Sequence, residues 1–401
     1  MAADAKGASI STLLLKEGRK IPRIDAAVSP HLHKAGRTIP RAMLDVLIAL
    51  VPALAVAVLV FGMNVIYVVS VSIVVAALSE LLMRKIMRRK VTLYDLSAVV
   101  TGLLFAFLLP PTTPLWVVAI GAFIAVAVAK ELFGGLGKNV FNPALLARVI
   151  LMFTPLSIYT AKFVQPFFWR QVGFFTPVTT NVINRATATV SYTTMGGLRL
   201  DGVNAATPLS LLNAGRLTDA VAGATPVGAT WFTSGGRPSL LSLFLGFKAG
   251  SIGEVSVIAL LLGGLYLIKR GTINWRIPVG ILAAFMLFNL VAWNSPLYQL
   301  MSGAIILGAF FMATDWVTSP MTNRGMWIYA VGIGITVAFL RVEGFHAEAV
   351  AVSILNWNLF TLAIDRYIAQ PRFGESRWRL FNRLPEFPRA APLPRSKVNW
   401  V

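Results

Sequence analysis

Apolar residues occur in long runs along this chain, and short polar stretches separate the runs. Five runs approach the roughly 17 to 25 residues that a helix needs to cross a bilayer, and the others are shorter or interrupted. The long runs are residues 43–61, 65–83, 115–129, 277–292 and 326–340, and the shorter ones are 96–109, 144–153, 255–268, 305–313 and 349–364. This pattern predicts an all-α polytopic membrane protein with about ten transmembrane helices.

Composition supports the membrane assignment. Hydrophobic residues make up 56% of the 401 positions and charged residues only 13%, which does not suit a soluble domain of this length. The net charge of +20 raises nucleic acid as a ligand class, but the basic residues flank apolar runs instead of sharing one face with aromatic side chains. We therefore expect contacts with membrane lipid and none with nucleic acid.

Basic residues are concentrated in alternate connections between the predicted helices. With a cytoplasmic N-terminus, most Lys and Arg fall in cytoplasmic segments, including 84–90 and the C-terminal tail. Because cytoplasmic connections are enriched in Lys and Arg, we predict that both termini are cytoplasmic. The predicted regions are a cytoplasmic N-terminal arm (1–42), a first transmembrane helix group (43–155), a long extracytoplasmic loop region (156–253), a second transmembrane helix group (254–366) and a basic cytoplasmic tail (367–401).

Two stretches of the chain read alike. "YDLSAVVTGLLF" begins at Tyr94 and "GEVSVIALLLGG" begins at Gly253, and each has an acid, an aliphatic residue, a serine and an apolar run. They fall on the third and sixth predicted helices, which cross the membrane in opposite directions. We predict an inverted repeat, an arrangement that places ligands or ions where interrupted helices meet. The alternative is chance similarity between apolar segments.

The sequence lacks the residues that several kinds of redox and catalytic site require. The chain has no cysteine and three histidines, His31, His33 and His346, none of which lies in a predicted helix. It therefore supplies neither a Cys-ligated iron–sulfur cluster nor a pair of histidines for a haem within the membrane. We expect no metal site and no catalytic residue, and any electron transfer must use an organic cofactor.

A few polar residues stand out against the apolar background. Arg148 lies within the predicted helix 144–153, and a charge there needs a buried partner such as a carboxylate, a phosphate or a flavin carbonyl. The alternative is a side chain that extends to the membrane interface. Asp95 and Glu254 stand at the start of the two repeated helices, and Asp315 follows "GAFFMAT". Each acid either takes part in a site or only caps a helix.

The segment "GGLGKNVFNPAL" also has two interpretations. Its glycines allow close backbone approach, and Asn139 and Asn142 can hydrogen bond to the polar edge of a ring. A structural turn followed by an Asn cap explains the same residues without a ligand.

Together, several motifs resemble one family of membrane subunits. They are "SPHLH" followed by "RTIPRAMLDVLIALVPA", "GGLGKNVFNPALLARV", "DGVNAATPL", "GSIGEVSVIALLLGGLYLI" and "GAFFMATDWVTSPMTNRG". This family contains the D subunit of the Rnf electron-transport complex and the homologous B subunit of the sodium-pumping NADH:quinone oxidoreductase. The resemblance covers roughly residues 29–367, and "SPH" and "ATPL" favour the Rnf branch.

The resemblance implies two flavins. Family members carry FMN joined by a phosphoester to a threonine, and they hold riboflavin noncovalently. The matching threonine here is Thr207, six positions after Asp201, although Asn204 stands where the motif usually has Ser or Thr. A second copy of the pattern, "DAVAGAT", ends at Thr225 and leaves that residue as an alternative acceptor. We expect riboflavin near Asn139, Asn142 and Asp315 on the cytoplasmic side, and Arg148 and Glu254 are further candidates for cofactor binding.

The resemblance also implies partners and a location. The complex would move electrons between ferredoxin and NAD in the bacterial inner membrane, coupled to transport of Na⁺ or H⁺. Expected partners are the other Rnf subunits, including a second FMN-carrying subunit and iron–sulfur subunits, and a flavin transferase that attaches FMN to the extracytoplasmic loop. Two other functions stay open: the B subunit of the quinone reductase, and a secondary transporter or channel without redox chemistry.

Overall fold

Apolar runs become helices because a bilayer offers no hydrogen-bond partner to the backbone. The computed structural model describes residues 38–368, apart from 172, 185–188, 195–198, 201–203, 206, 210–232, 235–236, 293–294 and 345–347. Each predicted apolar run is helical within it. These helices are α2 (Ile39–Phe61), α3 (Asn64–Ile86), α4 (Ser97–Phe107), α5 (Leu115–Phe123) continued by the π-helix η2 (Ile124–Glu131), α6 (Pro143–Met152), α10 (Val257–Arg270), α11 (Arg276–Val291), α13 (Ile305–Leu307) continued by the π-helix η6 (Gly308–Met312), α14 (Asn323–Val342) and α15 (Ala349–Tyr367).

The lengths of three helices agree with the predicted membrane protein. Among the described residues, α2, α3 and α14 are long and apolar enough to cross a bilayer, and α4, α6 and α11 are shorter apolar helices. The prediction of about ten crossings therefore remains a prediction for the shorter helices.

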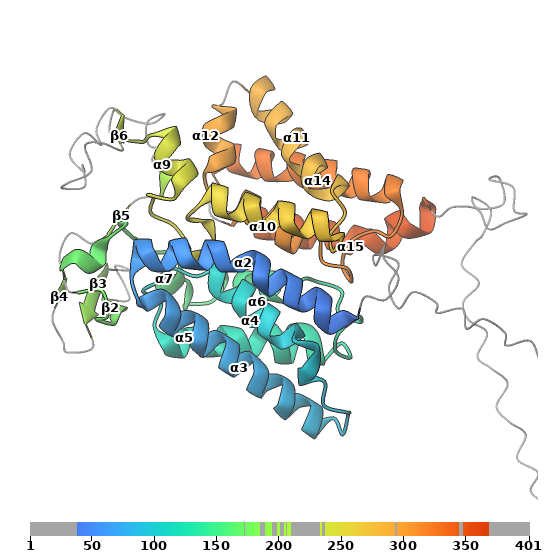
Figure 1. Ribbon diagram of the computed structural model, residues 1–401, viewed down its shortest axis with the longest axis horizontal. Coiled ribbons are helices and arrows are strands. Elements are labelled where there is room, and N and C mark those ends of the chain that lie inside the picture. Colours follow the sequence, from blue (N-terminus) through green and yellow to red (C-terminus); the bar gives the residue numbers. More distant parts are fainter. Residues whose placement is uncertain are drawn as a thin grey trace, which may run out of the picture.

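The helices form two groups that lie side by side (Figure 1). In the first group α3 contacts α4 and α5, and in the second α14 contacts α11 and α15. α2 packs against α10 where the groups meet. The contact is close because Gly263 has no side chain: a Cβ there would lie 2.1 Å from the carbonyl oxygen of Ala49. Asp45 of α2 also binds α10, since its carboxylate accepts hydrogen bonds from Tyr266 Oη and Arg270 Nε, both at 3.1 Å.

The predicted loop region contains strands, so the all-α prediction is wrong there, although the chain is mostly helical. β2 (Val178–Asn184), β3 (Thr189–Thr194) and β4 (Arg199–Leu200) form an antiparallel sheet. Two-stranded ladders join β1 (Phe163–Val164) to β5 (Asn204–Ala205) and β6 (Thr233–Ser234) to β7 (Arg237–Pro238). The Thr and Val residues of "VTTNVIN" and "TVSYTT" favour extended backbone. These strands lie at one end of the helix groups (Figure 1).

Short helices complete the described elements. α7 (Ser157–Thr160), η3 (Phe168–Gln171) and α9 (Leu240–Leu245) belong to the loop region, and α12 (Pro296–Met301) follows α11.

The two similar stretches share a local structure. Each begins with a short 3₁₀ turn, η1 (Leu93–Asp95) or η5 (Ile252–Glu254), and continues into α4 or α10. Asp95 accepts hydrogen bonds from the backbone N–H of Ser97 at 2.8 Å and from its hydroxyl at 2.5 Å. Glu254 instead accepts the N–H of Ser251 at 2.8 Å. Both acids therefore cap turns, and the inverted relation of the two halves stays a prediction.

Candidate functional site

One cavity lies where the two helix groups meet, and three predicted site residues line it. Asn139 and Asn142 come from the turn before α6, and Asp315 comes from the turn after η6. The cavity volume is about 90 Å³, within about 780 Å³ of space between atoms that includes open solvent. Polar walls are added by Ser97 and Thr101 of α4, Lys130 of η2, and Thr272 and Thr314; apolar walls include Leu104, Phe310, Phe311 and Trp316. We call this space the central pocket.

Asn142 links two elements that form the wall of this pocket. Its Oδ1 accepts hydrogen bonds from the N–H groups of Ala144 at 3.1 Å and Leu145 at 3.3 Å, which caps α6. Its Nδ2 donates to the carbonyl oxygen of Met312 at 3.2 Å and so ties α6 to η6. The structural interpretation of Asn142 is therefore confirmed, and its amide orients the pocket wall.

Asn139 and Asp315 are in contact in the wall of the central pocket. The Asn139 side chain hydrogen bonds to Asp315, and its Nδ2 also donates to the carbonyl oxygen of Phe141 at 3.1 Å. Burial raises the pKa of Asp315, while hydrogen bonds from its neighbours, including the Thr318 hydroxyl at 3.3 Å, oppose that rise. The glycines of "GGLG" shape the loop, because Gly134, Gly135 and Gly137 all have positive φ.

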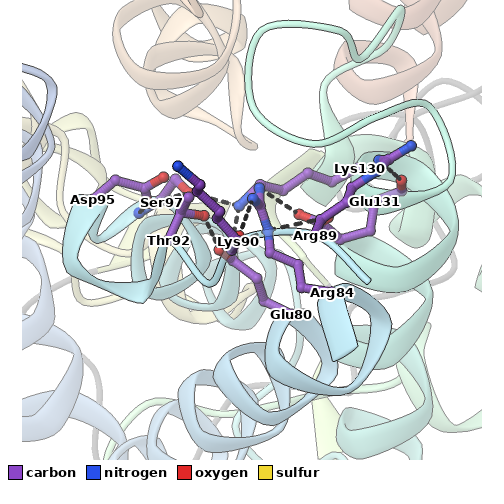
Figure 2. Close-up of polar contacts among 9 residues, drawn as sticks. All are labelled: Glu80, Arg84, Arg89, Lys90, Thr92, Asp95, Ser97, Lys130 and Glu131. Carbon is purple, nitrogen blue, oxygen red and sulfur yellow. Dashed lines mark hydrogen bonds and ion pairs between the residues drawn. The ribbon is translucent and has the colours of Figure 1, made fainter. Parts of the chain in front are cut away.

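A cluster of four buried charges adjoins the pocket, and sequence reasoning missed it. Lys130 Nζ lies 2.8 Å from Glu80 Oε2, and Arg84 Nε lies 3.3 Å from Glu131 Oε2 (Figure 2). We call these four residues the charge cluster. A signal was present, because Glu80 falls within the apolar run 65–83, where an ionisable residue needs a partner.

Arg148 and Glu254 line a different, smaller cavity. There Arg148 forms an ion pair with Glu348, through Nη2 and Oε1, and donates to the carbonyl oxygen of Thr160 at 3.2 Å. Arg148 is only 3% exposed, so the alternative of a side chain at the membrane interface is wrong. The predicted carboxylate partner is present, and we call this space the Arg148 cavity.

Two further buried cations, also missed from the sequence, lie in the second half of the chain. Lys248 Nζ donates to the carbonyl oxygen of Met301 at 2.6 Å, and burial lowers the pKa of Lys248 to about 8. Arg341 donates to the carbonyl oxygens of Gln299 at 2.6 Å and Ser302 at 3.1 Å. Neither was singled out because their partners are backbone carbonyls that only the fold brings close.

Thr207 lies in the loop region, at a partly exposed position between β5 and the buried Leu209. β5 pairs with β1, with Ala205 opposite Phe163, and Phe163 lines the Arg148 cavity. The Thr207 segment is therefore anchored beside that cavity and is separate from the residues of the central pocket. Asp201 and the alternative acceptor Thr225 lie outside the described residues.

Comparisons with known proteins cover most of the chain. The model of the NQR2, RnfD, RnfE family matches residues 25–374. The D subunit of the Na⁺-translocating ferredoxin:NAD⁺ oxidoreductase complex of Acetobacterium woodii is 37% identical over 351 residues, which cover 87% of this chain and 95% of that protein.

Two other relatives give the same picture. The D subunit of the proton-translocating ferredoxin:NAD⁺ oxidoreductase complex of Clostridium ljungdahlii is 36% identical, and the match covers 87% of this chain and 96% of that protein. The D subunit of an ion-translocating oxidoreductase complex of Actinobacillus succinogenes is 33% identical, and the match covers 86% and 96% of the two chains.

Proposed function

Because the chain belongs to the NQR2, RnfD, RnfE family, we propose that it is the D subunit of an ion-translocating ferredoxin:NAD⁺ oxidoreductase complex, a membrane protein that carries flavin. Its role is to relay electrons, which requires no catalytic side chain and no metal ligand from this chain. The observation that carries the proposal within the chain is the meeting of Asn139, Asn142 and Asp315 in one pocket. The B subunit of the sodium-pumping quinone reductase, which the sequence motifs also resemble, is the alternative.

The central pocket suits riboflavin. It combines a few amide, hydroxyl and carboxyl groups with a wall of aromatic and aliphatic side chains, as a planar ring with one polar edge requires. Asn139 and Asp315 would bind that edge, and Asn142 would position them by fixing the start of α6 to η6. Bound riboflavin supplies the redox chemistry that the side chains of this chain lack.

Thr207 is our proposed attachment point for FMN, through a phosphoester. Its partly exposed position in the loop region suits modification by a flavin transferase, since a modifying enzyme needs access to the hydroxyl. Asp201 precedes it in the motif, and Arg148 and Glu254 lie in the cavity that Phe163 of β1 borders. Thr225 is the alternative acceptor.

Electron transfer across the membrane would connect these two sites. In the proposed topology the termini and the central pocket face the cytoplasm of the bacterial cell, and the Thr207 loop faces the outside of the inner membrane. The protein would exchange electrons with a second FMN-carrying subunit and with iron–sulfur subunits, and transport Na⁺ or H⁺. A carboxylate serves either ion, and the relatives include a Na⁺-translocating and a proton-translocating complex.

In-gel flavin fluorescence tests the proposal. The chain is expressed with a flavin transferase, denatured, and run on a gel, where only covalently held flavin stays with the protein. We expect a fluorescent band at the position of this protein. A dark band, with a known flavinylated protein fluorescent in the same cells, would contradict the proposal and favour a transporter or channel without redox chemistry.

A further inference from the structure

Lys130 lines the central pocket and is also a member of the charge cluster. Its Nζ donates to Glu80 Oε2 at 2.8 Å and to Ser97 Oγ at 2.6 Å. Ser97 also lines the pocket and in turn donates to Asp95 Oδ1 at 2.5 Å. One side chain thus joins the pocket wall to a buried carboxylate of α3.

The charge cluster is balanced and almost closed to solvent. It contains two cations and two carboxylates, and the side chains of Glu80 and Glu131 have no exposed surface. Thr92 Oγ1 donates to Glu80 Oε1 at 2.8 Å, and Arg84 Nη1 donates to the carbonyl oxygen of Lys90 at 2.9 Å. An unpaired charge is costly to bury. A change in the charge of one of these four residues must therefore be offset by an opposite change in charge at another.

The π-helix η2 presents Lys130 and Glu131 to this cluster. α5 runs as an α-helix to Phe123 and then widens to π-helical winding as far as Glu131. π-helical turns are rare and occur often at functional sites. Here the wide turn places two consecutive ionisable residues in the buried interior between α3 and the pocket.

We propose that Lys130 couples the charge state of the ligand in the central pocket to occupation of Glu80 and Glu131 by a monovalent cation. The proposal rests on the function proposed above, which places a redox-active ligand in the pocket. An electron delivered by a partner subunit adds negative charge beside Lys130. Lys130 then interacts less with Glu80, and a proton or Na⁺ entering from solvent restores neutrality at the carboxylates. No covalent bond of the chain forms or breaks in this step: the partner subunit supplies the electron, solvent supplies the proton or Na⁺, and within the chain only the contact between Lys130 and Glu80 weakens.

Other charged groups near Lys130 determine the net charge around the two carboxylates and the pocket. Arg84 Nε lies 3.5 Å from Glu80 Oε1 and 3.3 Å from Glu131 Oε2, so both carboxylates keep a positive neighbour when Lys130 turns to the pocket. Arg89 contacts only the backbone carbonyl of Glu131, at 3.5 Å. Asp315 lines the pocket together with Lys130, and its carboxylate repels the negative charge of a reduced ligand. Lys130 is therefore the cation in the pocket lining that offsets added negative charge.

Redox titration of the noncovalent flavin in the purified complex tests the coupling, with Lys130→Met, Lys130→Arg and the exposed Lys138→Met compared with the wild type. Lys130→Met should bind reduced flavin at least about tenfold less tightly relative to oxidised flavin, which lowers the potential of a one-electron couple by about 59 mV or more and that of a two-electron couple by about 30 mV or more. Lys130→Arg should retain most of the wild-type potential, and Lys138→Met all of it. If Lys130→Met does not fold, Lys130→Met with Glu80→Gln removes both charges of the pair and is titrated instead.

The potential is measured against pH and against Na⁺ concentration. The proposal is supported if the wild-type potential changes with pH or with Na⁺ concentration and if this dependence is smaller in Lys130→Met or in the double variant. The variable on which the potential depends identifies the cation. A wild-type potential independent of both, or a Lys130→Met potential equal to that of Lys138→Met, would overturn it. Flavin content is measured first. A wild-type complex without noncovalent flavin contradicts the proposed function. Bound flavin whose potential does not change when Lys130 is substituted contradicts only the coupling.

Discussion

Arg148 of α6 and Glu348, the residue before α15, form an ion pair that joins the two halves of the chain. The Arg148 side chain is 4% exposed and the Glu348 side chain 13% exposed. Both line the Arg148 cavity, which Glu254 and Phe163 also border. The charge that first suggested a site within an apolar helix is thus neutralised by a distant carboxylate beside the anchor of the Thr207 segment.

Removal of one partner of this pair should destabilise the protein. Arg148→Met leaves Glu348 without its cation and should cost about 3 to 5 kcal/mol of unfolding free energy. Thermal unfolding of the purified protein in detergent measures the loss. Arg148→Met combined with Glu348→Gln should recover part of it, while the exposed Arg324→Met serves as the control. Equal stability of Arg148→Met and Arg324→Met would mean that the pair has no structural role.

Lys248 should make stability depend on pH in a defined window. Burial lowers its pKa from 10.5 to about 8, so between these values the unfolded chain holds a proton that the folded chain has lost. Stability attributable to Lys248 therefore rises as pH increases from about 8 to 10.5, by about 3 kcal/mol at most. The unfolding temperature of the wild type minus that of Lys248→Met should rise across this range. The exposed Lys269→Met is the control, and a difference that stays constant with pH would contradict the assignment.

The two asparagines of the central pocket should respond differently to substitution. Asn142→Ala removes the α6 cap, worth about 1 kcal/mol, and the bond to Met312, so stability and riboflavin content should both fall. Asn142→Asp keeps the cap acceptor but loses the donor to Met312 and buries a carboxylate oxygen against that carbonyl, so it should not recover wild-type stability. Asn139→Ala should lose riboflavin with a smaller change in stability. Melting curves and flavin extraction measure both properties, and normal riboflavin content in Asn139→Ala would exclude this residue from the site.

Topology can be tested with reporter fusions. A reporter fused after Gly215 should signal an extracytoplasmic position, and one fused after Tyr367 a cytoplasmic position, because the basic connections place both termini inside. The reverse pattern would overturn the proposed orientation, and with it the assignment of the two flavins to opposite faces.

Much of the helical fold could be predicted because the apolar runs are long and each must satisfy its own backbone hydrogen bonds. The central pocket was partly predictable as well. Asn142 follows a glycine-rich turn and precedes Pro143, a pattern typical of a helix start. Its neighbour Asn139 was selected from the same glycine-rich segment and Asp315 as an acid that follows an apolar run, and the fold then placed all three in one cavity.

Other features depended on tertiary contacts that no local pattern contains. Glu80 is a single acid in an apolar run, and Lys130 follows one, yet only the packing of η2 on α3 shows that they form a pair. Lys248 resembles any loop lysine until the carbonyl of Met301 is seen beside it. The strands β2 and β3 were missed because the region was interpreted by its polarity and its glycines, and its β-branched residues were not weighed.

Identification of the flavinylated residue tests the central claim most directly. The chain, co-expressed with a flavin transferase, is digested, and the fluorescent peptide is identified by mass, in the wild type and in Thr207→Ala and Thr225→Ala. The account predicts one FMN phosphoester on the peptide that contains Thr207, its loss in Thr207→Ala and its retention in Thr225→Ala. A fully fluorescent Thr207→Ala protein, or a wild-type protein with no covalent flavin, would contradict it.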